Sequence, residues 1–164
     1  MNSTESQAEI QQQAQEIWDG AAAAPDQHPF FACWGVSVNG LKIYRGDLSI
    51  DGVRCDGMLL VPMRDAERNL QNLAFLGVTE RHYLSNDHVL NSYFGFGQRC
   101  DPILVVEGFL RGARVHRAFG HAVAVAFTAE NVPNVVAIMQ KRHAAARIAL
   151  IARDGSIEDA DAAV

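Results

Sequence analysis

The chain has 164 residues, of which 49% are hydrophobic and 20% charged, a composition typical of one globular domain with its own core. No apolar run approaches the roughly 20 residues that a membrane-spanning helix needs, so we expect no membrane insertion. The first residues, MNSTESQAEIQQQ, lack the basic and apolar regions of a secretory signal. Three cysteines without CxxC spacing do not suit a disulfide framework. We therefore expect a cytoplasmic protein.

Charge is distributed unevenly along the chain. Fourteen Lys and Arg against 19 Asp and Glu give a net charge of −5, which speaks against a nucleic-acid binder. Residues 1–26 contain five acids and residues 154–164 contain four, and neither segment has a Lys or Arg. The segment 27–153 therefore has ten acids against fourteen bases, a charge of +4. This mildly basic body suits a surface that faces phosphate, and equally an ordinary solvated surface.

The N-terminal half is predicted to form one helix and a small β region. Ile10, Ala14 and Ile17 recur at helical spacing and Pro25 follows, which predicts a helix over 3–24. From Gly40, short apolar runs separated by turn residues predict antiparallel strands. These runs are 41–44, 58–61, 70–77 and 82–84. The polar residues 64–69 predict a hairpin over 58–77, and 86–97 is expected to be a loop or short strand.

From Pro102 the pattern changes to strands that alternate with helices. Continuous apolar runs at 103–106, 122–127 and 147–152 predict buried strands. A helix is expected between the first two, ending near Phe119 with Gly120 as its C-cap. Asn131 and Pro133 are expected to open a second helix that runs to about Ala145. The order β-α-β-α-β predicts a parallel sheet with right-handed crossovers.

Ligands of open parallel sheets bind at the carboxyl ends of the strands, which makes the residues after these runs candidates. They are Glu107, Thr128, Arg153 and Asp154. A carboxylate between a buried strand and Gly108 is a candidate metal ligand or acid–base group. The alternative is an acid that interacts with the dipole of the following helix.

Several motifs in unbroken order carry a family resemblance. In the C-terminal half they are ILVVEGF at 103–109, Gly112-Ala113 with His116, VAVAF at 123–127 with Asn131, and RIALIA at 147–152. Upstream they are HPFFA at 28–32, GMLLVPMRDA at 57–66, LQNL at 70–73 and YFGFG at 93–97. From about residue 14 to residue 154, the chain resembles the Toprim domain of plasmid- and phage-borne primases with the region that precedes it.

The resemblance implies a metal site. In that family a Glu after the first strand and an Asp-x-Asp after a later strand hold a divalent metal, usually magnesium, for phosphoryl transfer. Glu107 matches the first acid, but the later motif reads Arg153-Asp154-Gly155. Thr128 stands where relatives usually carry Asp. A guanidinium at the metal position repels a divalent cation, so we expect no metal, or magnesium held weakly, at Glu107.

Two basic groups are candidate nucleic-acid-binding residues. Arg111, Arg114 and Arg117 follow one another at a spacing of three on the first expected helix, and Lys141 and Arg142 end the second. Such residues contact phosphates in nucleic-acid binders. The alternative is an ordinary solvated helix face whose C-terminal bases suit the helix dipole.

We therefore expect an α/β fold. An N-terminal helix (1–26) and a small antiparallel β region (27–101) lead into a truncated Toprim-like β-α-β-α-β sheet (102–154), followed by an acidic tail (155–164). Relatives have further elements after Asp-x-Asp and zinc-binding modules before Toprim, so we do not expect a self-sufficient primase.

Three functions follow from these expectations. The first is a catalytically impaired relative of mobile-element primases that binds single-stranded DNA or a replication or conjugation protein. Such a protein would act in replication or transfer of a plasmid or phage, for example as a fertility inhibitor. The second is an active magnesium-dependent primase or nuclease that uses Glu107, Asp154 and a carboxylate of the tail. The third is a subunit that docks onto a replication or secretion complex through its acidic tail.

Overall fold

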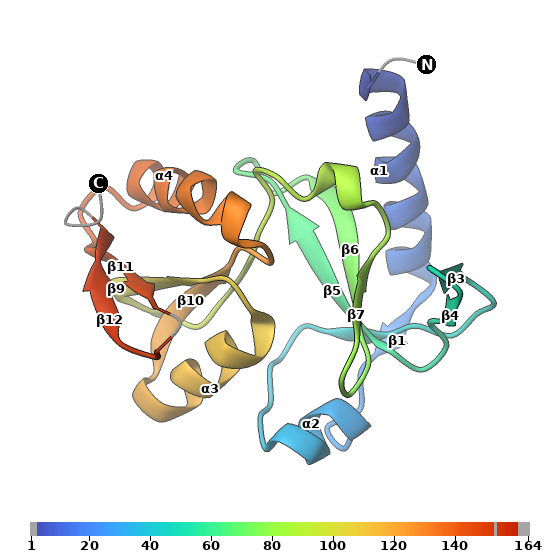
Figure 1. Cartoon of the computed structure of the whole chain (residues 1–164), viewed down its shortest axis with the longest axis horizontal. Helices are drawn as coiled ribbons and strands as arrows, with labels where there is room; N and C mark the ends of the chain where they lie inside the picture. The colour runs from blue at the N-terminus through green and yellow to red at the C-terminus, as the bar shows by residue number, and fades with distance from the viewer. Residues whose placement is uncertain (1–2, 153, 161–164) are drawn as a thin grey trace. The chain divides into compact units, whose positions relative to one another are not determined.

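The computed structural model describes residues 3–152 and 154–160, and it divides into two compact units (Figure 1). The first unit spans 1–89 and the second 90–164. The sequence pattern placed the main boundary at 101/102. The boundary lies earlier because β8 (Phe94–Phe96) and the first residues of β9 (Arg99–Val106) already belong to the sheet of the second unit.

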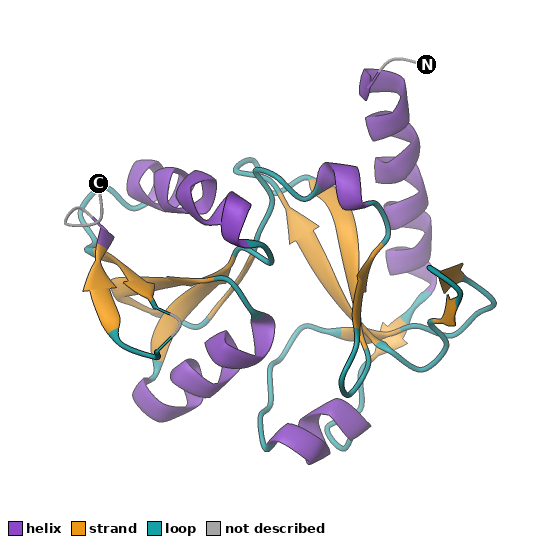
Figure 2. Ribbon diagram, viewed as in Figure 1, coloured by secondary structure: helices purple, strands orange, loops and turns teal. Residues whose placement is uncertain are grey.

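The first unit is built on a five-stranded antiparallel sheet with strand order β1-β2-β5-β6-β7 (Figure 2). Its strands are β1 (Ala22–Ala23), β2 (Lys42–Ile43), β5 (Leu59–Arg64), β6 (Leu70–Leu76) and β7 (Arg81–Tyr83). The predicted hairpin is confirmed as the pair β5–β6, in which Leu60 lies opposite Phe75. A 3-10 turn, η1 (Asn86–His88), follows β7.

Helix α1 (Ser3–Gly20) packs against this sheet through its apolar side chains. Ala14 is fully buried in one cluster with Leu60 and Phe75, and Ile17 and Trp18 pack against the same cluster. The helix ends at Gly20 and not at residue 24, because Ala22 and Ala23 give their backbone to the pairing with β2. Tertiary strand pairing therefore overrides the helical propensity of this alanine run.

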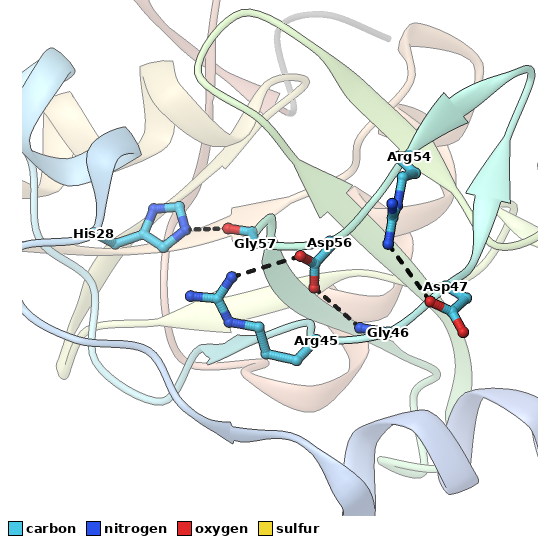
Figure 3. A network of polar contacts seen from close by, with 7 residues as sticks. All are labelled: His28, Arg45, Gly46, Asp47, Arg54, Asp56 and Gly57. Atoms are coloured by element: carbon cyan, nitrogen blue, oxygen red, sulfur yellow. Dashed lines mark hydrogen bonds and ion pairs between the residues drawn. The ribbon is translucent and has the colours of Figure 1, made fainter.

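His28 organises a short helix that the sequence pattern did not predict, α2 (Pro29–Trp34). Its ring is buried; Nδ1 accepts a hydrogen bond from the Phe30 amide at 3.1 Å, and Nε2 lies 2.7 Å from the Gly57 carbonyl (Figure 3). Because the amide can only donate, Nδ1 carries no proton and Nε2–H donates to Gly57. The histidine thus caps α2 and ties it to the turn before β5.

A small hairpin lies between β2 and β5, formed by β3 (Ser49–Ile50) and β4 (Val53–Arg54). Arg54 pairs with Asp47 at 3.5 Å and Arg45 with Asp56 at 3.8 Å beside it (Figure 3). These pairs are exposed, and exposed ion pairs contribute little to stability. The hairpin is held to the unit by apolar residues that pack against the core cluster, namely Leu48, Ile50 and Val53.

The second unit contains a mixed sheet with strand order β12-β11-β9-β10-β8. Its inner strands β11 (Ile148–Ile151), β9 and β10 (His121–Val125) are parallel, which confirms the predicted parallel arrangement. The outer strands β8 and β12 (Ile157–Asp159) are antiparallel to their neighbours. The predicted acidic tail therefore supplies an edge strand, because the backbone of 157–159 pairs with β11.

Helices α3 (Phe109–Phe119) and α4 (Val132–Arg142) lie on opposite faces of this sheet (Figure 2). Gly112 lets α3 approach closely: an added Cβ would lie 2.9 Å from side-chain carbons of Val106 and Val123. The α3 helix ends as predicted, with Gly120 left-handed at φ 76°. A 3-10 turn, η2 (Ala129–Asn131), precedes α4, which ends at Arg142 and not at residue 145. Within the described residues, no helix is both long and apolar enough to cross a membrane.

We predict that His28→Ala destabilises the first unit by about 1–3 kcal/mol, because the carbonyl of the half-buried Gly57 loses its donor and α2 loses its cap. Urea unfolding followed by circular dichroism measures this change. His28→Asn keeps an acceptor at the cap position and should recover part of the loss. A decrease below about 0.5 kcal/mol for His28→Ala would contradict the assigned role.

Candidate functional site

The three parallel strands of the second unit end at one edge of the sheet. β9 ends at Val106 and is followed by Glu107, while β11 ends at Ile151. The Ala126 amide donates to the Val106 carbonyl at 2.8 Å, which keeps the end of β10 beside the end of β9. The residues after these strands, which the sequence marked as candidates, therefore follow strand ends at the same edge.

Arg111 lies across this edge. It belongs to the first turn of α3, and its guanidinium Nη1 donates to the Ala152 carbonyl, just after β11, at 3.0 Å. The first turn of α3 contains no acidic residue, and its amide groups already carry partial positive charge. A fixed cation thus connects the helix after β9 with the loop after β11.

That loop is a tight β-hairpin connection between β11 and β12. The Gly155 amide donates to the Ala152 carbonyl at 2.9 Å, and the Ala152 amide donates to the Ser156 carbonyl at 2.8 Å. Gly155 has a left-handed φ of 87°, a conformation for which tight hairpin connections favour glycine. The glycine in the third position of Arg153-Asp154-Gly155 therefore has a conformational role, and an Asp there would be strained.

Asp154 accepts two hydrogen bonds from Ser156 within this loop, from the amide at 2.9 Å and from the hydroxyl at 2.6 Å. These bonds, with a smaller contribution from the nearby Arg111 charge, lower the pKa of the exposed Asp154 carboxyl below its ordinary value. The carboxylate is therefore already engaged by its own loop. Arg153, expected at the former metal position, lies outside the described residues.

Glu107 and Thr128 complete the predicted set. Both are half-buried, and no ion-pair partner of Glu107 lies among residues 3–152 and 154–160. Thr128 has extended backbone and caps η2 without a side-chain hydrogen bond. Over the same described residues, no three His, Cys, Asp or Glu side chains group closely enough to hold a metal ion.

Asn131 fixes the end of β10, a role that the sequence did not reveal. It is fully buried, and its amide nitrogen donates to the carbonyls of Ser92 at 2.7 Å and Ala126 at 2.9 Å. Asn131 occupies the N-cap position of α4 as predicted, but its side-chain oxygen accepts from the Asn91 amide at 2.7 Å and makes no capping bond to the helix. One of these acceptors, Ala126, directly precedes Phe127, a buried residue with a left-handed φ of 73°.

The two predicted basic groups do not form one surface. Arg111, Arg114 and Arg117 are all exposed along α3, whereas Lys141 and Arg142 lie in the last turn of α4 on the other face of the sheet (Figure 2). His116 Nδ1 donates to the His121 carbonyl 2.8 Å away, and the ring contacts that of Phe96. It belongs to the end of the helix.

Sequence reasoning missed two features of the edge. Arg111 was assigned only to a helix face, since its reach to the loop after β11 depends on the strand order β11-β9-β10. The Asp154–Ser156 turn had a readable signal, because Asp-Gly-Ser after a buried strand is typical of a turn closed by the aspartate side chain. Comparison of the chain with models of protein families, with curated proteins and with solved structures gave no match.

We predict that Ser156→Ala raises the pKa of Asp154 toward its ordinary value, because both the hydroxyl donor and the order of the turn are lost or weakened. Because the Asp154 pKa is lower in the folded than in the unfolded chain, the ionised carboxyl stabilises the fold above its unfolded pKa, near pH 4. This stabilisation is lost as pH falls through the folded pKa. An NMR titration of the Asp154 carboxyl in both proteins measures the shift. Identical titration curves for the two proteins would contradict the hydrogen bonding of Ser156 to the Asp154 carboxylate.

Proposed function

We propose that the chain is a catalytically impaired relative of the Toprim domain of mobile-element primases, and that it acts by binding single-stranded DNA. Its place would be in replication or conjugative transfer of a plasmid or phage, as a regulator and not as a polymerase. The arginine series of α3 is the observation that carries this proposal. One helix provides a cation at the strand edge and further cations on its exposed face.

The catalytic half of the proposal is supported by the charges at the strand edge. A divalent metal for phosphoryl transfer needs several carboxylate oxygens around it. Here Glu107 follows β9 at the edge that the Arg111 guanidinium spans, while Asp154 accepts hydrogen bonds from Ser156. A cation at this position disfavours a second, divalent one.

The binding half is supported by the exposed face of α3. Arg111 and Arg117 are six residue steps apart, or about 9 Å along the helix axis, with Arg114 midway, and α3 contains no Asp or Glu. Phosphates of a nucleic-acid strand recur every 3.4 Å or more, so two to three phosphates match this length. Lys141 and Arg142 lie on the opposite face and are excluded from the proposed surface.

We predict that changing Arg111, Arg114 and Arg117 together to Ala weakens binding to a short single-stranded oligonucleotide by at least about tenfold at low salt. The slope of log affinity against log salt should become shallower by about 2, since each lost phosphate contact removes about 0.7. Fluorescence anisotropy over a series of salt concentrations measures both quantities.

A matched control removes three exposed arginines from the first unit, Arg45, Arg54 and Arg81. It makes the same change in net charge and should leave the salt slope within about 0.5 of the unmodified protein. Equal losses of affinity in the two triple variants would show that net charge alone governs oligonucleotide binding, and would contradict a binding face on α3. Absence of binding by the unmodified protein would contradict the proposed function itself.

A further inference from the structure

An open groove of about 630 Å³ lies in the first unit between α1 and the turn that joins β5 to β6. One wall consists of glutamines of α1, including Gln7, Gln11 and Gln15, and the other includes Asp65 and Gln71. The lining is predominantly polar, and neither the proposed function nor the strand edge of the second unit uses it.

The orientation of the amides in this groove follows from one carboxylate. The Gln71 amide nitrogen donates to Asp65 Oδ2 at 2.7 Å, and a carboxylate can only accept, so Gln71 must turn its Oε1 away from Asp65. That oxygen receives hydrogen bonds from Gln11 at 2.6 Å and Gln7 at 3.1 Å. Gln71 is 9% exposed, which makes it the fixed centre of the network.

The same polarity continues along the helix. Gln12 donates to Glu16 at 3.3 Å and Gln15 donates to Asp19 at 2.8 Å. Every glutamine of the α1 wall therefore directs its amide nitrogen to an acceptor within the protein and turns its carbonyl oxygen away from that acceptor. Each of these amides keeps one N–H donor and the two acceptor sites of its oxygen, so acceptors outnumber donors on this wall.

Charge reinforces this preference for donors. Residues 1–26 contain five acids and no Lys or Arg, and the carboxylate of Asp65 lies on the opposite wall. A groove lined by one carboxylate and several amide oxygens, beside a helix without Lys or Arg, matches a planar cation with several N–H donors, and an arginine guanidinium offers five. A phosphate or carboxylate ligand would meet repulsion here.

We propose that this groove docks an arginine-rich peptide segment of a partner protein. The guanidinium groups donate to the outward carbonyl oxygens of Gln7 and Gln11, and the acids of α1 attract the segment as a whole. This interaction is independent of DNA binding by α3, because it uses the other unit and the opposite charge.

The test uses the full chain and a fluorescently labelled hexa-arginine peptide as probe, with binding followed by anisotropy. Gln11→Lys places a cation in the groove and should weaken binding by at least about tenfold, whereas Gln13→Lys makes the same charge change at an exposed position of α1 outside the groove and should change it less than about twofold. Gln11→Glu should strengthen binding by about two- to fivefold. Lys, Glu and Gln have similar helix propensities, so the helix is preserved.

Equal weakening by Gln11→Lys and Gln13→Lys would overturn the proposal, because net charge alone would then explain the binding. Failure of the unmodified protein to bind the peptide would overturn it as well. A hexa-lysine peptide that binds as tightly as hexa-arginine would also contradict it, since recognition by planar multiple donors would be absent. None of these outcomes affects the DNA-binding proposal, which is measured with an oligonucleotide.

Discussion

The hydrogen bond from Arg111 to the Ala152 carbonyl determines the chemistry of the candidate site. It joins the helix that follows β9 to the loop that follows β11, so the two strand ends share one cation. The guanidinium therefore places a positive charge at the edge where β9 leads into Glu107. We propose that the site attracts anionic groups more readily than it holds a divalent metal.

The strand order makes this contact possible. The chain passes from β9 through α3 to β10 and then returns through α4 to β11 on the other side of β9. With α3 and α4 on opposite faces, the start of α3 lies beside the space between β9 and β11. Gly112 brings α3 close to the sheet, and Asn131 fixes the end of β10, so the geometry of the edge depends on packing some distance from it.

Much of the fold follows from periodicity alone. The buried runs of β9, β10 and β11, the helix end at Gly120 and the hairpin β5–β6 all have strong local signals, and each was predicted. Several elements that were missed depend on tertiary contacts: α2 on the His28 bond to Gly57, β1 on pairing with β2, and β12 on pairing with β11. Of the candidate site, sequence placed Glu107 and Asp154 after strands, but it could not give the turn of Asp154 toward Ser156 or the reach of Arg111.

We propose that this edge does not bind a divalent metal, and thermal unfolding in the presence of magnesium or manganese tests this proposal most directly. A ligand that binds only the folded state raises the melting temperature, and a site occupied a hundredfold above its dissociation constant adds about 2.7 kcal/mol, or several degrees. We expect about 10 mM metal to raise neither the melting temperature of the unmodified protein nor that of Glu107→Ala, and the two shifts to agree within about 1 °C. A rise of several degrees that Glu107→Ala abolishes would contradict the account.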